Sequence, residues 1–444
     1  MNSPTHSSAP PTAVRLLAGD PVSGSVAVPG SKSQTNRLFV LSALADGVST
    51  ITDAMVADDA VHMVGALRTL GIAVEPLDET ARNWQITGCG GELPDVGPVT
   101  VDAGLAGTVM RFVAAVATLA PHATTITGRP PLIGRPVGEL LRALRGVGAS
   151  IDGSGDDGGF PPVVVRPSRP RGGSATVDAR RSSQFASALA AVSPYFQDGI
   201  DLEVEGLEAS GYFDLTVELM RRRGVRLQRT PTGLTVEPGC YQALSERVPG
   251  DISSASHLLT VAAATGGRIR LDNLSGAELQ PDFKILDTLV AFGCEVQPGD
   301  DGSISITGPE RLNPVTVDLS STPDQLPNVA VLASLAAGQT VISGVGITRF
   351  HETDRIYAIE QELAKAGVNV HSTADTVTVD GGTARPGASL TTYHDHRLGM
   401  AFAALGLAVG DTVIDGADCV AKTFPGFWDA VKAIGGQVTR IDPS

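Results

Sequence analysis

The stretch SKSQTNRLFVLSALA (31–45) joins a short polar motif to an alanine-rich apolar run, and this combination occurs six times along the chain. Successive copies open 74, 76, 70, 71 and 71 residues apart. The openings lie at Ser33, Gly107, Ser183, Ser253, Asp324 and Asp395. A repeat of about 70 residues is longer than the repeats of common solenoids, so each copy should be a substantial α/β unit.

Each copy also contains a leucine-rich segment, a glycine and a short β-branched segment, as in LRTLGIAV (67–74) and LMRRRGVRL (219–227). The alanine-rich runs, such as FVAAVATLA (112–120), are apolar on every side, which is typical of buried helices. In contrast, AIEQELAKAG (358–367) is amphipathic and should lie nearer solvent. We therefore expect each unit to contain a buried helix, a strand, an amphipathic helix and further strands.

The length of 444 residues and the apolar content of 42% allow more than one domain with a large core. Six similar units divide naturally into two domains of three units. We expect one domain at residues 31–247 and another that combines residues 13–30 with 248–444. The expected hinges between them lie just before Ser31 and near residues 247–250. Residues 1–12 are polar and rich in Pro and Ser, which predicts a disordered tail.

The overall charge and the cysteine content exclude several classes of protein. A net charge of −15 without a basic block argues against a nucleic-acid surface. No apolar run approaches the roughly 20 residues of a membrane span, and the N-terminus lacks the features of a signal peptide. Four cysteines without a CxxC pair indicate no disulfide framework. We expect a cytoplasmic monomer that binds neither nucleic acid nor membrane.

The openings of the six apolar runs are the expected N-termini of buried helices, and they carry small, hydroxyl and charged residues. Backbone N–H groups and the helix dipole make such ends suitable for anions. Because the chain as a whole is acidic, an anionic ligand would have to be held by a local basic pocket.

Seven motifs occur in one order along the chain. They are VPGSKSQTNR (28–37), AGTVMR (106–111), SSQF (182–185), PGDISSA (249–255), HETDRI (351–356), DHRLGM (395–400) and KTFPGF (422–427). This series resembles the 5-enolpyruvylshikimate-3-phosphate synthases over roughly residues 15–440. The resemblance implies a two-domain, inside-out α/β barrel in which each domain has three βαβαββ units with buried parallel helices.

The resemblance also implies an activity. Enzymes of this family transfer the enolpyruvyl group of phosphoenolpyruvate to the 5-hydroxyl of shikimate 3-phosphate and release phosphate, in the pathway to aromatic amino acids. Their partners are therefore two small anionic substrates, and neither a metal nor an organic cofactor is implied. Glyphosate would occupy the phosphoenolpyruvate site.

Site residues follow from the same resemblance, position by position. The residues implied for phosphoenolpyruvate are Lys32, Gly107, Gln184, Arg355, Arg397, Lys422 and, by substitution, Arg129. Those implied for shikimate 3-phosphate are Lys32, Ser33, Arg37, Ser182, Ser183, Gln184, Ser210, Asp324 and His351. Asp324 would be the general base, while Glu352 and Lys32 compete as the proton donor. Without the resemblance, Asp324 and the serines would be read as helix caps, and Glu352 as a surface charge.

Two positions depart from the family pattern. His351 stands where the family commonly has a lysine that contacts substrate hydroxyls. In GRPPLIGRP (128–136), Pro131 stands where the family usually has an arginine that binds phosphoenolpyruvate. Arg129 is the nearest arginine on the N-terminal side of that place, so either it substitutes in a shifted loop or the site is weakened.

Four other interpretations have less support. The pair His394 and His396 has no third ligand at a recognisable spacing, so we expect no metal site. The loop PLIGRP (131–136) lacks the reactive cysteine of the related UDP-N-acetylglucosamine transferases. The chain could still transfer enolpyruvate to another phosphorylated acceptor, or bind ligands without catalysis, but retention of Asp324 and Glu352 argues for the family's reaction.

Overall fold

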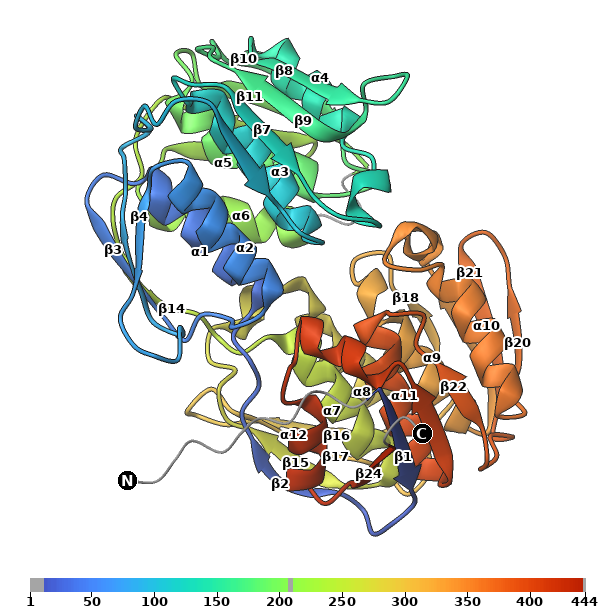
Figure 1. Cartoon of the computed structure of the whole chain (residues 1–444). Helices are drawn as coiled ribbons and strands as arrows, with labels where there is room; N and C mark the ends of the chain where they lie inside the picture. The colour runs from blue at the N-terminus through green and yellow to red at the C-terminus, as the bar shows by residue number, and fades with distance from the viewer. Residues whose placement is uncertain (1–11, 207–210, 442–444) are drawn as a thin grey trace. The chain divides into compact units, whose positions relative to one another are not determined.

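The computed structural model describes residues 12–206 and 211–441 (Figure 1). Ser210 and residues 1–11 of the expected tail lie outside the described residues. The chain forms two compact units. Unit 1 combines the described part of Met1–Val28 with Gly250–Glu278 and Asp282–Ser444, and unit 2 comprises Pro29–Pro249 with Leu279–Pro281. The chain passes between the units two residues from each of the hinges expected from the sequence.

Unit 2 contains three four-stranded sheets with one shared topology. In each sheet a parallel pair is followed by two antiparallel pairings. The orders are β14 (Ser245–Arg247), β3 (Val48–Thr52), β5 (Trp84–Thr87), β4 (Ala73–Pro76); β6 (Val99–Asp102), β7 (Thr124–Thr127), β9 (Phe160–Arg166), β8 (Ser150–Ser154); and β10 (Gly173–Asp178), β11 (Ile200–Glu205), β13 (Gly233–Val236), β12 (Leu227–Arg229).

Unit 1 repeats the same topology three times. The orders are β2 (Ser23–Val26), β15 (Arg268–Leu271), β17 (Ile304–Thr307), β16 (Glu295–Pro298); β18 (Thr316–Asp318), β19 (Gly338–Ser343), β21 (Thr376–Gly381), β20 (Asn369–Ser372); and β22 (Ser389–Thr391), β23 (Thr412–Asp415), β1 (Ala13–Leu17), β24 (Gln437–Ile441). The six sheets found in residues 12–206 and 211–441 share one topology, which confirms the expected repeat of βαβαββ units.

Strands from distant parts of the chain complete three of the sheets. β1 lies between β23 and β24, so the N-terminal strand completes the last repeat of unit 1. β2 pairs in parallel with β15 and begins the first repeat of unit 1. β14 pairs in parallel with β3, so the end of unit 2 supplies the first strand of its own first repeat. Unit 2 is therefore inserted into the first repeat of unit 1.

In each of these repeats a buried helix precedes the second strand of the sheet. These helices are α1 (Lys32–Leu44), α3 (Gly107–Val116), α5 (Gln184–Val192), α7 (Ile252–Thr265), α9 (Leu326–Leu335) and α11 (His396–Val409). Each begins within two residues of the opening expected from the sequence. Nearly all of their residues are buried, as their uniformly apolar composition predicts.

The second helix of each repeat carries one apolar face. These helices are α2 (Asp58–Thr69), α4 (Gly138–Gly146), α6 (Gly211–Arg222), α8 (Ile285–Ala291), α10 (Arg355–Lys365) and α12 (Phe427–Ala433). In α10, Ile359 and Leu363 are buried while Tyr357 is half exposed, so the amphipathic expectation is confirmed.

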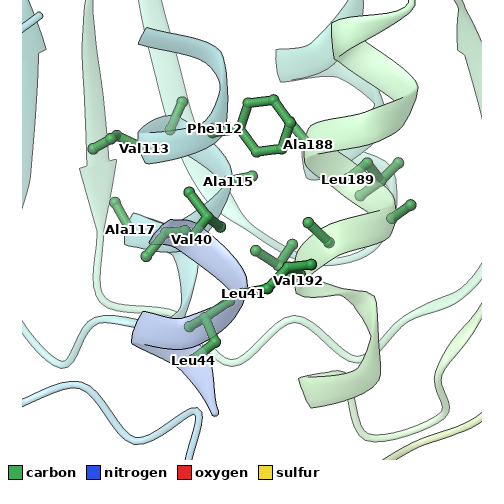
Figure 2. Close-up of a cluster of buried hydrophobic side chains, with 14 of the residues drawn as sticks. Val40, Leu41, Leu44, Phe112, Val113, Ala115, Ala117, Ala188, Leu189 and Val192 are labelled. Carbon is green, nitrogen blue, oxygen red and sulfur yellow. The ribbon is translucent and has the colours of Figure 1, made fainter. Parts of the chain in front are cut away.

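The cores are built where the buried helices meet. In unit 2, Leu41 of α1, Phe112 of α3 and Leu189 of α5 belong to one cluster of buried side chains (Figure 2). Small side chains such as Ala115 and Ala188 let these helices approach closely, which compensates for the low aromatic content. In unit 1, α11 lies against both α7 and α9.

Candidate active site

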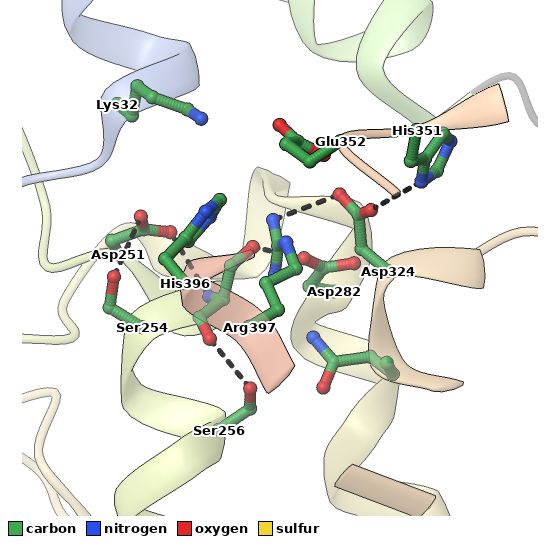
Figure 3. A network of polar contacts seen from close by, with 12 residues as sticks. Lys32, Asp251, Ser254, Ser256, Asp282, Asp324, His351, Glu352, His396 and Arg397 are labelled. Carbon is green, nitrogen blue, oxygen red and sulfur yellow. Dashed lines mark hydrogen bonds and ion pairs between the residues drawn. The ribbon is translucent and has the colours of Figure 1, made fainter. Parts of the chain in front are cut away.

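In unit 1 the turn before α9 carries the carboxylate of Asp324, which contacts three basic side chains; Figure 3 shows two of them, His351 and Arg397. Asp324 lies in the 3₁₀ turn η7 (Pro323–Gln325), immediately before α9. Its Oδ2 is 2.9 Å from Nη2 of Arg397. Its Oδ1 is 2.7 Å from Nη1 of Arg355 and 3.3 Å from Nδ1 of His351. Asp324 therefore contacts the basic residues of two expected motifs and does not occupy the N-cap position of α9, which is Gln325.

Arg355 links these groups into a continuous chain of opposite charges. This fully buried side chain, at the first position of α10, donates from Nε to Asp395 at 2.8 Å and from Nη2 to Glu352 at 3.1 Å. The other oxygen of Glu352 accepts from Nζ of Lys422 at 3.0 Å. Burial alone would lower the pKa of Arg355, but the carboxylates of Asp395 and Asp324 raise it. The guanidinium therefore stays charged in the interior.

The ionisation of Asp324 follows from the same contacts. Burial by itself would raise the pKa of this carboxyl group. The positive charges of Arg397 and Arg355, with the hydrogen bond to His351, instead hold that pKa well below its usual range. Asp324 is therefore a carboxylate at physiological pH, as a general base must be.

The N-terminus of α7 adds further acidic and hydroxyl groups to the polar side chains around Asp324 (Figure 3). Asp251 caps the helix by accepting from the backbone N–H of Ser253 at 3.1 Å. The hydroxyl of Ser253 donates to the buried carboxyl group of Asp282. Burial raises the pKa of Asp282, against the opposing charge of Arg397. The pKa of Asp282 is thus shifted in the opposite direction from that of Asp324, although both lie near Arg397.

A buried polar network connects α7 to α9 and to the residue that follows Asp324. Nδ1 of His257 is 2.7 Å from Oδ1 of Asn328. The amide nitrogen of Asn328 donates to Ser256 at 2.9 Å and to Gln325 at 3.0 Å. Gln325 directly follows Asp324, so the network holds in place the turn that carries the carboxylate.

In unit 2 the N-terminus of α1 presents the first expected motif. Ser31 accepts from the backbone N–H of Gln34 at 3.4 Å and caps the helix. Lys32 is the first helical residue, and its Nζ is 3.9 Å from Oδ2 of the buried Asp59 in α2. Asp59 was missed in the sequence analysis, although its place at the start of an expected helix after a strand was a possible signal.

Arg37 lies one turn further along α1 and is fully buried. Its guanidinium donates to Thr216 at 2.7 Å, to the carbonyl of Ser33 at 2.9 Å and to the carbonyl of Tyr212 at 3.1 Å. The group also lies 5.4 Å from the centre of the Phe112 ring. Burial lowers the pKa of Arg37 to about 10. In this structure the side chain ties α1 to α6, and its role toward a carboxylate substrate stays a prediction.

A side-chain hydrogen bond links α3 to the N-terminus of α5. Nη1 of Arg111 donates to Oε1 of Gln184 at 2.7 Å, and the Arg111 guanidinium lies 5.1 Å from the centre of the Phe185 ring. A Cβ on Gly107 would stand 3.4 Å from Nη1 of Arg111, so the bare backbone leaves room in front of this arginine. The structure thus brings Gly107 and Gln184 together.

The serines before α5 have different local roles. Ser182 accepts from the backbone N–H of Gln184 at 3.3 Å. Ser183 occupies the N-cap position of α5 but its side chain forms no cap hydrogen bond. The third serine of the expected phosphate site, Ser210, lies outside the described residues.

Arg129 does not join this group of side chains in the structure. Its side chain is 66% exposed, and its Nη2 lies 3.2 Å from Oδ2 of Asp102 at the end of β6. Arg135, at the end of the same loop, comes close to Gly107 instead. Arg135 was the second residue that the sequence analysis did not assign.

Comparisons with known proteins identify the family. The family model described as "EPSP synthase (3-phosphoshikimate 1-carboxyvinyltransferase)" matches residues 16–431. The chain belongs to the EPSP synthase family. The 3-phosphoshikimate 1-carboxyvinyltransferase of Methanoculleus marisnigri is 36% identical over 427 residues, which cover 95% of this chain and 99% of the relative. The same-named protein of Methanothermobacter thermautotrophicus is 39% identical over 413 residues, covering 93% and 96%.

A solved EPSP synthase from Acinetobacter baumannii has the same architecture. It superposes with a TM-score of 0.82 at 25% sequence identity, and the alignment covers 96% of this chain and 99% of that one. The expectation of an inside-out α/β barrel built from repeated units is therefore confirmed. Five of the EPSP synthase motifs lie at the N-termini of buried helices, while HETDRI (351–356) lies at the start of α10 and KTFPGF (422–427) at the start of α12.

The remaining predictions concern the pair of histidines, metal binding, membrane-spanning helices and the cysteines. His394 is exposed while His396 is buried at the start of α11, so the two rings occupy different environments. In residues 12–206 and 211–441, no cluster of three His, Cys, Asp or Glu side chains could hold a metal ion. No helix in that part of the chain is long and apolar enough to cross a membrane. All four cysteines are free.

Proposed function

We propose that this protein transfers the enolpyruvyl group of phosphoenolpyruvate to the 5-hydroxyl of shikimate 3-phosphate. The observation that carries the proposal is the carboxylate of Asp324 held between Arg355, Arg397 and His351 in a chain of the EPSP synthase family. The other features below support it.

The charges of unit 1 suit a substrate with two anionic groups. Arg355, Arg397 and Lys422 gather their positive charge within a small region. Their present partners are carboxylates of the protein, so a substrate carboxylate or phosphate would compete for the same hydrogen-bond donors. We assign Arg355 and Arg397 to the carboxylate of phosphoenolpyruvate, and Arg397 and Lys422, with Lys32, to the departing phosphate.

Competition between the substrate and Asp324 for the arginines would also control how strong a base Asp324 is. The arginines that would bind the substrate are the groups that keep the pKa of Asp324 low. When a substrate anion takes a share of their hydrogen bonds, the carboxylate loses stabilisation and becomes a stronger base. Asp324 would then accept the proton of the 5-hydroxyl only after phosphoenolpyruvate has bound.

The chemistry proceeds by addition and elimination. The 5-hydroxyl oxygen forms a bond to C2 of phosphoenolpyruvate as its proton passes to Asp324, while C3 receives a proton from Glu352 or Lys32. The tetrahedral intermediate then expels phosphate and loses a C3 proton to regenerate the double bond. Both candidate proton donors lie beside charged partners, Glu352 beside Lys422 and Lys32 beside Asp59.

Unit 2 would supply most contacts to the acceptor. We assign Ser33 and Arg37 to the shikimate carboxylate, and Ser182, Ser183, Gln184 and Ser210 to its phosphate. Lys32, Asp324 and His351 complete the acceptor contacts. Gly107 and Gln184 would contact phosphoenolpyruvate, and the assignment of Arg129 to that substrate stays a prediction. We also propose that the protein works as a cytoplasmic monomer without a cofactor, with its domains divided as the sequence predicts.

The test is phosphate release from phosphoenolpyruvate by the purified protein, with and without shikimate 3-phosphate. Product formation that depends on both substrates supports the proposal. Asp324→Ala should lower kcat by about 10²- to 10⁴-fold, the usual contribution of a general base. The matched control is Asp354→Ala, because Asp354 caps α10 by accepting from Tyr357 but lies outside the proposed chemistry. Equal kcat losses in the two variants would contradict the role of Asp324.

Two other results of this assay would contradict the proposal and indicate a different function. Phosphate release with a different phosphorylated acceptor, and none with shikimate 3-phosphate, would identify a related transferase. Binding of phosphoenolpyruvate without turnover of any acceptor would identify a binding protein. Light scattering coupled to gel filtration decides the oligomeric state.

A further inference from the structure

The connection between β22 and α11, residues 392–395, has an unusual backbone. Tyr393 and His394 both adopt a positive φ, of 53° and 57°. This left-handed conformation is uncommon for residues other than glycine and is a true outlier for a bulky side chain such as Tyr. Two such residues in succession persist only where surrounding contacts over-determine the conformation. The connection leads directly into Asp395 and Arg397, so the contacts that hold it bear on the proposed site.

The buried carboxylate of Glu362, on α10, holds one side of this connection. Its Oε2 accepts from the backbone N–H of Thr391 at 2.8 Å, and its Oε1 accepts from the hydroxyl of Tyr393 at 2.8 Å. Nζ of Lys365 donates to both oxygens, at 2.8 and 2.7 Å. The Glu362 side chain is fully buried, so these hydrogen bonds form in a region of low dielectric, where they are stronger than in water.

The hydrogen bond between Tyr393 and Glu362 has a defined direction. Burial, together with this hydrogen bond, raises the pKa of the Tyr393 hydroxyl to about 12. The phenol therefore keeps its proton at physiological pH and donates it to the carboxylate. Because the acceptor is ionised, the bond is charge-assisted and stronger than one between neutral groups.

A second anchor holds the other side of the connection. The N–H of Thr392 donates to the carbonyl of Asp415 at 3.2 Å, and its hydroxyl donates to the carbonyl of Gly416 at 3.0 Å, both at the end of β23. The N–H of Asp395 then donates to the carbonyl of Thr392 at 2.8 Å and closes the turn. Because β23 holds Thr392 and α10 holds Tyr393, the two anchors keep the backbone between them in its strained conformation.

The same helix also contacts the far end of the connection. Arg355 and Glu362 lie seven residues, or two turns, apart and therefore share one face of α10. Nε of Arg355 donates to Asp395 at 2.8 Å, and Asp395 caps α11 by accepting from the backbone N–H of Arg397 at 2.9 Å. One residue separates Tyr393 from Asp395, so a displacement at the first would be passed on to the second.

We propose that Glu362 and Tyr393 are positioning residues for the transfer reaction. They hold the start of α11 in register with α10, which keeps Arg397 beside Asp324. Neither residue needs to touch a substrate in this role. The inference rests on the proposed function, because Arg397 is assigned there to phosphoenolpyruvate.

The test compares kcat and the Michaelis constants of the wild type with those of Glu362→Ala and Glu362→Gln. A displacement of about 1 Å in a catalytic group lowers the rate by about 10²-fold, so we expect a loss of that order in kcat/KM for phosphoenolpyruvate in Glu362→Ala. KM for shikimate 3-phosphate should change far less, because most of its proposed contacts come from unit 2. Glu362→Gln should recover most of the loss, since its amide oxygen can still accept from the N–H of Thr391.

Tyr393→Phe removes one hydroxyl and keeps the ring, so it tests the pair even if Glu362→Ala does not fold. It should lower kcat/KM for phosphoenolpyruvate in the same direction, and the double variant should be no worse than Glu362→Ala alone. The matched control is Leu363→Ala, a fully buried neighbour on the same helix. It should lower the free energy of unfolding in urea but leave kcat and KM of the folded protein unchanged.

A folded Glu362→Ala variant with wild-type kcat and KM overturns the inference. Equal losses of kcat/KM in Glu362→Ala and Leu363→Ala also overturn it, because they would show a general weakening of unit 1. Losses that multiply in the double variant would show that Glu362 and Tyr393 act independently and would overturn the pair.

Calorimetric binding of phosphoenolpyruvate in the presence of shikimate 3-phosphate separates this inference from the proposed function. A wild type that binds phosphoenolpyruvate but does not turn over refutes the function alone, and weaker binding in Glu362→Ala would then still support the positioning role. An active wild type whose affinity and turnover are both retained in Glu362→Ala refutes the inference alone.

Discussion

The buried imidazole of His257 should make the stability of the protein fall in mild acid. His257 lies inside unit 1 with 1% of its surface exposed, and its Nδ1 contacts Asn328. Burial, with the positive charge of Arg397, lowers its pKa to about 3, and the hydrogen bond to Asn328 opposes this shift only weakly. We consider the variant His257→Gln, whose amide can still donate to Asn328 but does not titrate.

The expected loss of stability follows from proton binding in the two states. In the unfolded chain an imidazole takes up a proton near pH 6.5, whereas His257 in the native state remains neutral until about pH 3. Between these values the unfolded state binds more protons, so the free energy of unfolding falls as the pH falls. At pH 5 the difference of about 1.5 pH units corresponds to roughly 2 kcal/mol. This figure is the same for any native pKa below about 4.

Urea denaturation at pH 7.5 and at pH 5 measures this effect. Other groups titrate in the same interval, so the quantity to compare is the change in unfolding free energy of the wild type minus that of His257→Gln. We expect the wild type to lose about 2 kcal/mol more than the variant. Parallel losses in the two proteins would refute the reasoning and show that His257 binds a proton inside the fold.

Two further predictions concern unit 2. Gly107→Ala should keep or raise the melting temperature, because Ala favours the helix, yet raise KM for phosphoenolpyruvate as the methyl group contacts Arg111 and Arg135. Inhibition by glyphosate should weaken even more, and an equal loss for substrate and inhibitor would contradict steric crowding. Arg223→Leu should cost about 3–5 kcal/mol in urea denaturation, because it leaves Glu246 of β14 without its buried partner. The double variant with Glu246→Leu should recover part of that loss, and strictly additive losses would argue against the pair.

Local sequence information was sufficient for the repeated elements. The apolar runs predicted six buried helices because a helix without a polar face can be stable only inside a core. The period of about 70 residues predicted equivalent units, and the six sheets of one topology agree with it. Strands β4 and β12 were expected from the β-branched segments at the ends of LRTLGIAV (67–74) and LMRRRGVRL (219–227). These features depend on neighbours in the chain.

The partners of individual charged side chains depended on tertiary structure. The sequence predicted that Asp324 caps a helix in addition to its chemical role, but the carboxylate, carried by the turn η7, contacts Arg355 and Arg397. The residues come from segments separated by about 30 to 70 positions, and no local pattern specifies such contacts. The pairing of Lys32 with Asp59 was missed for the same reason.

The sequence by itself determined the repeat, the buried helices, the family and the set of residues from which a site could be built. The tertiary structure decided which of two arginines in GRPPLIGRP (128–136) reaches Gly107. Arg129 stands nearer in sequence to the place of the missing family arginine, but it pairs with Asp102 at the end of a strand. Burial of Leu132 turns the loop so that Arg135 approaches Arg111. The direction of a loop side chain is set by what the loop packs against, and that information lies in residues distant along the chain.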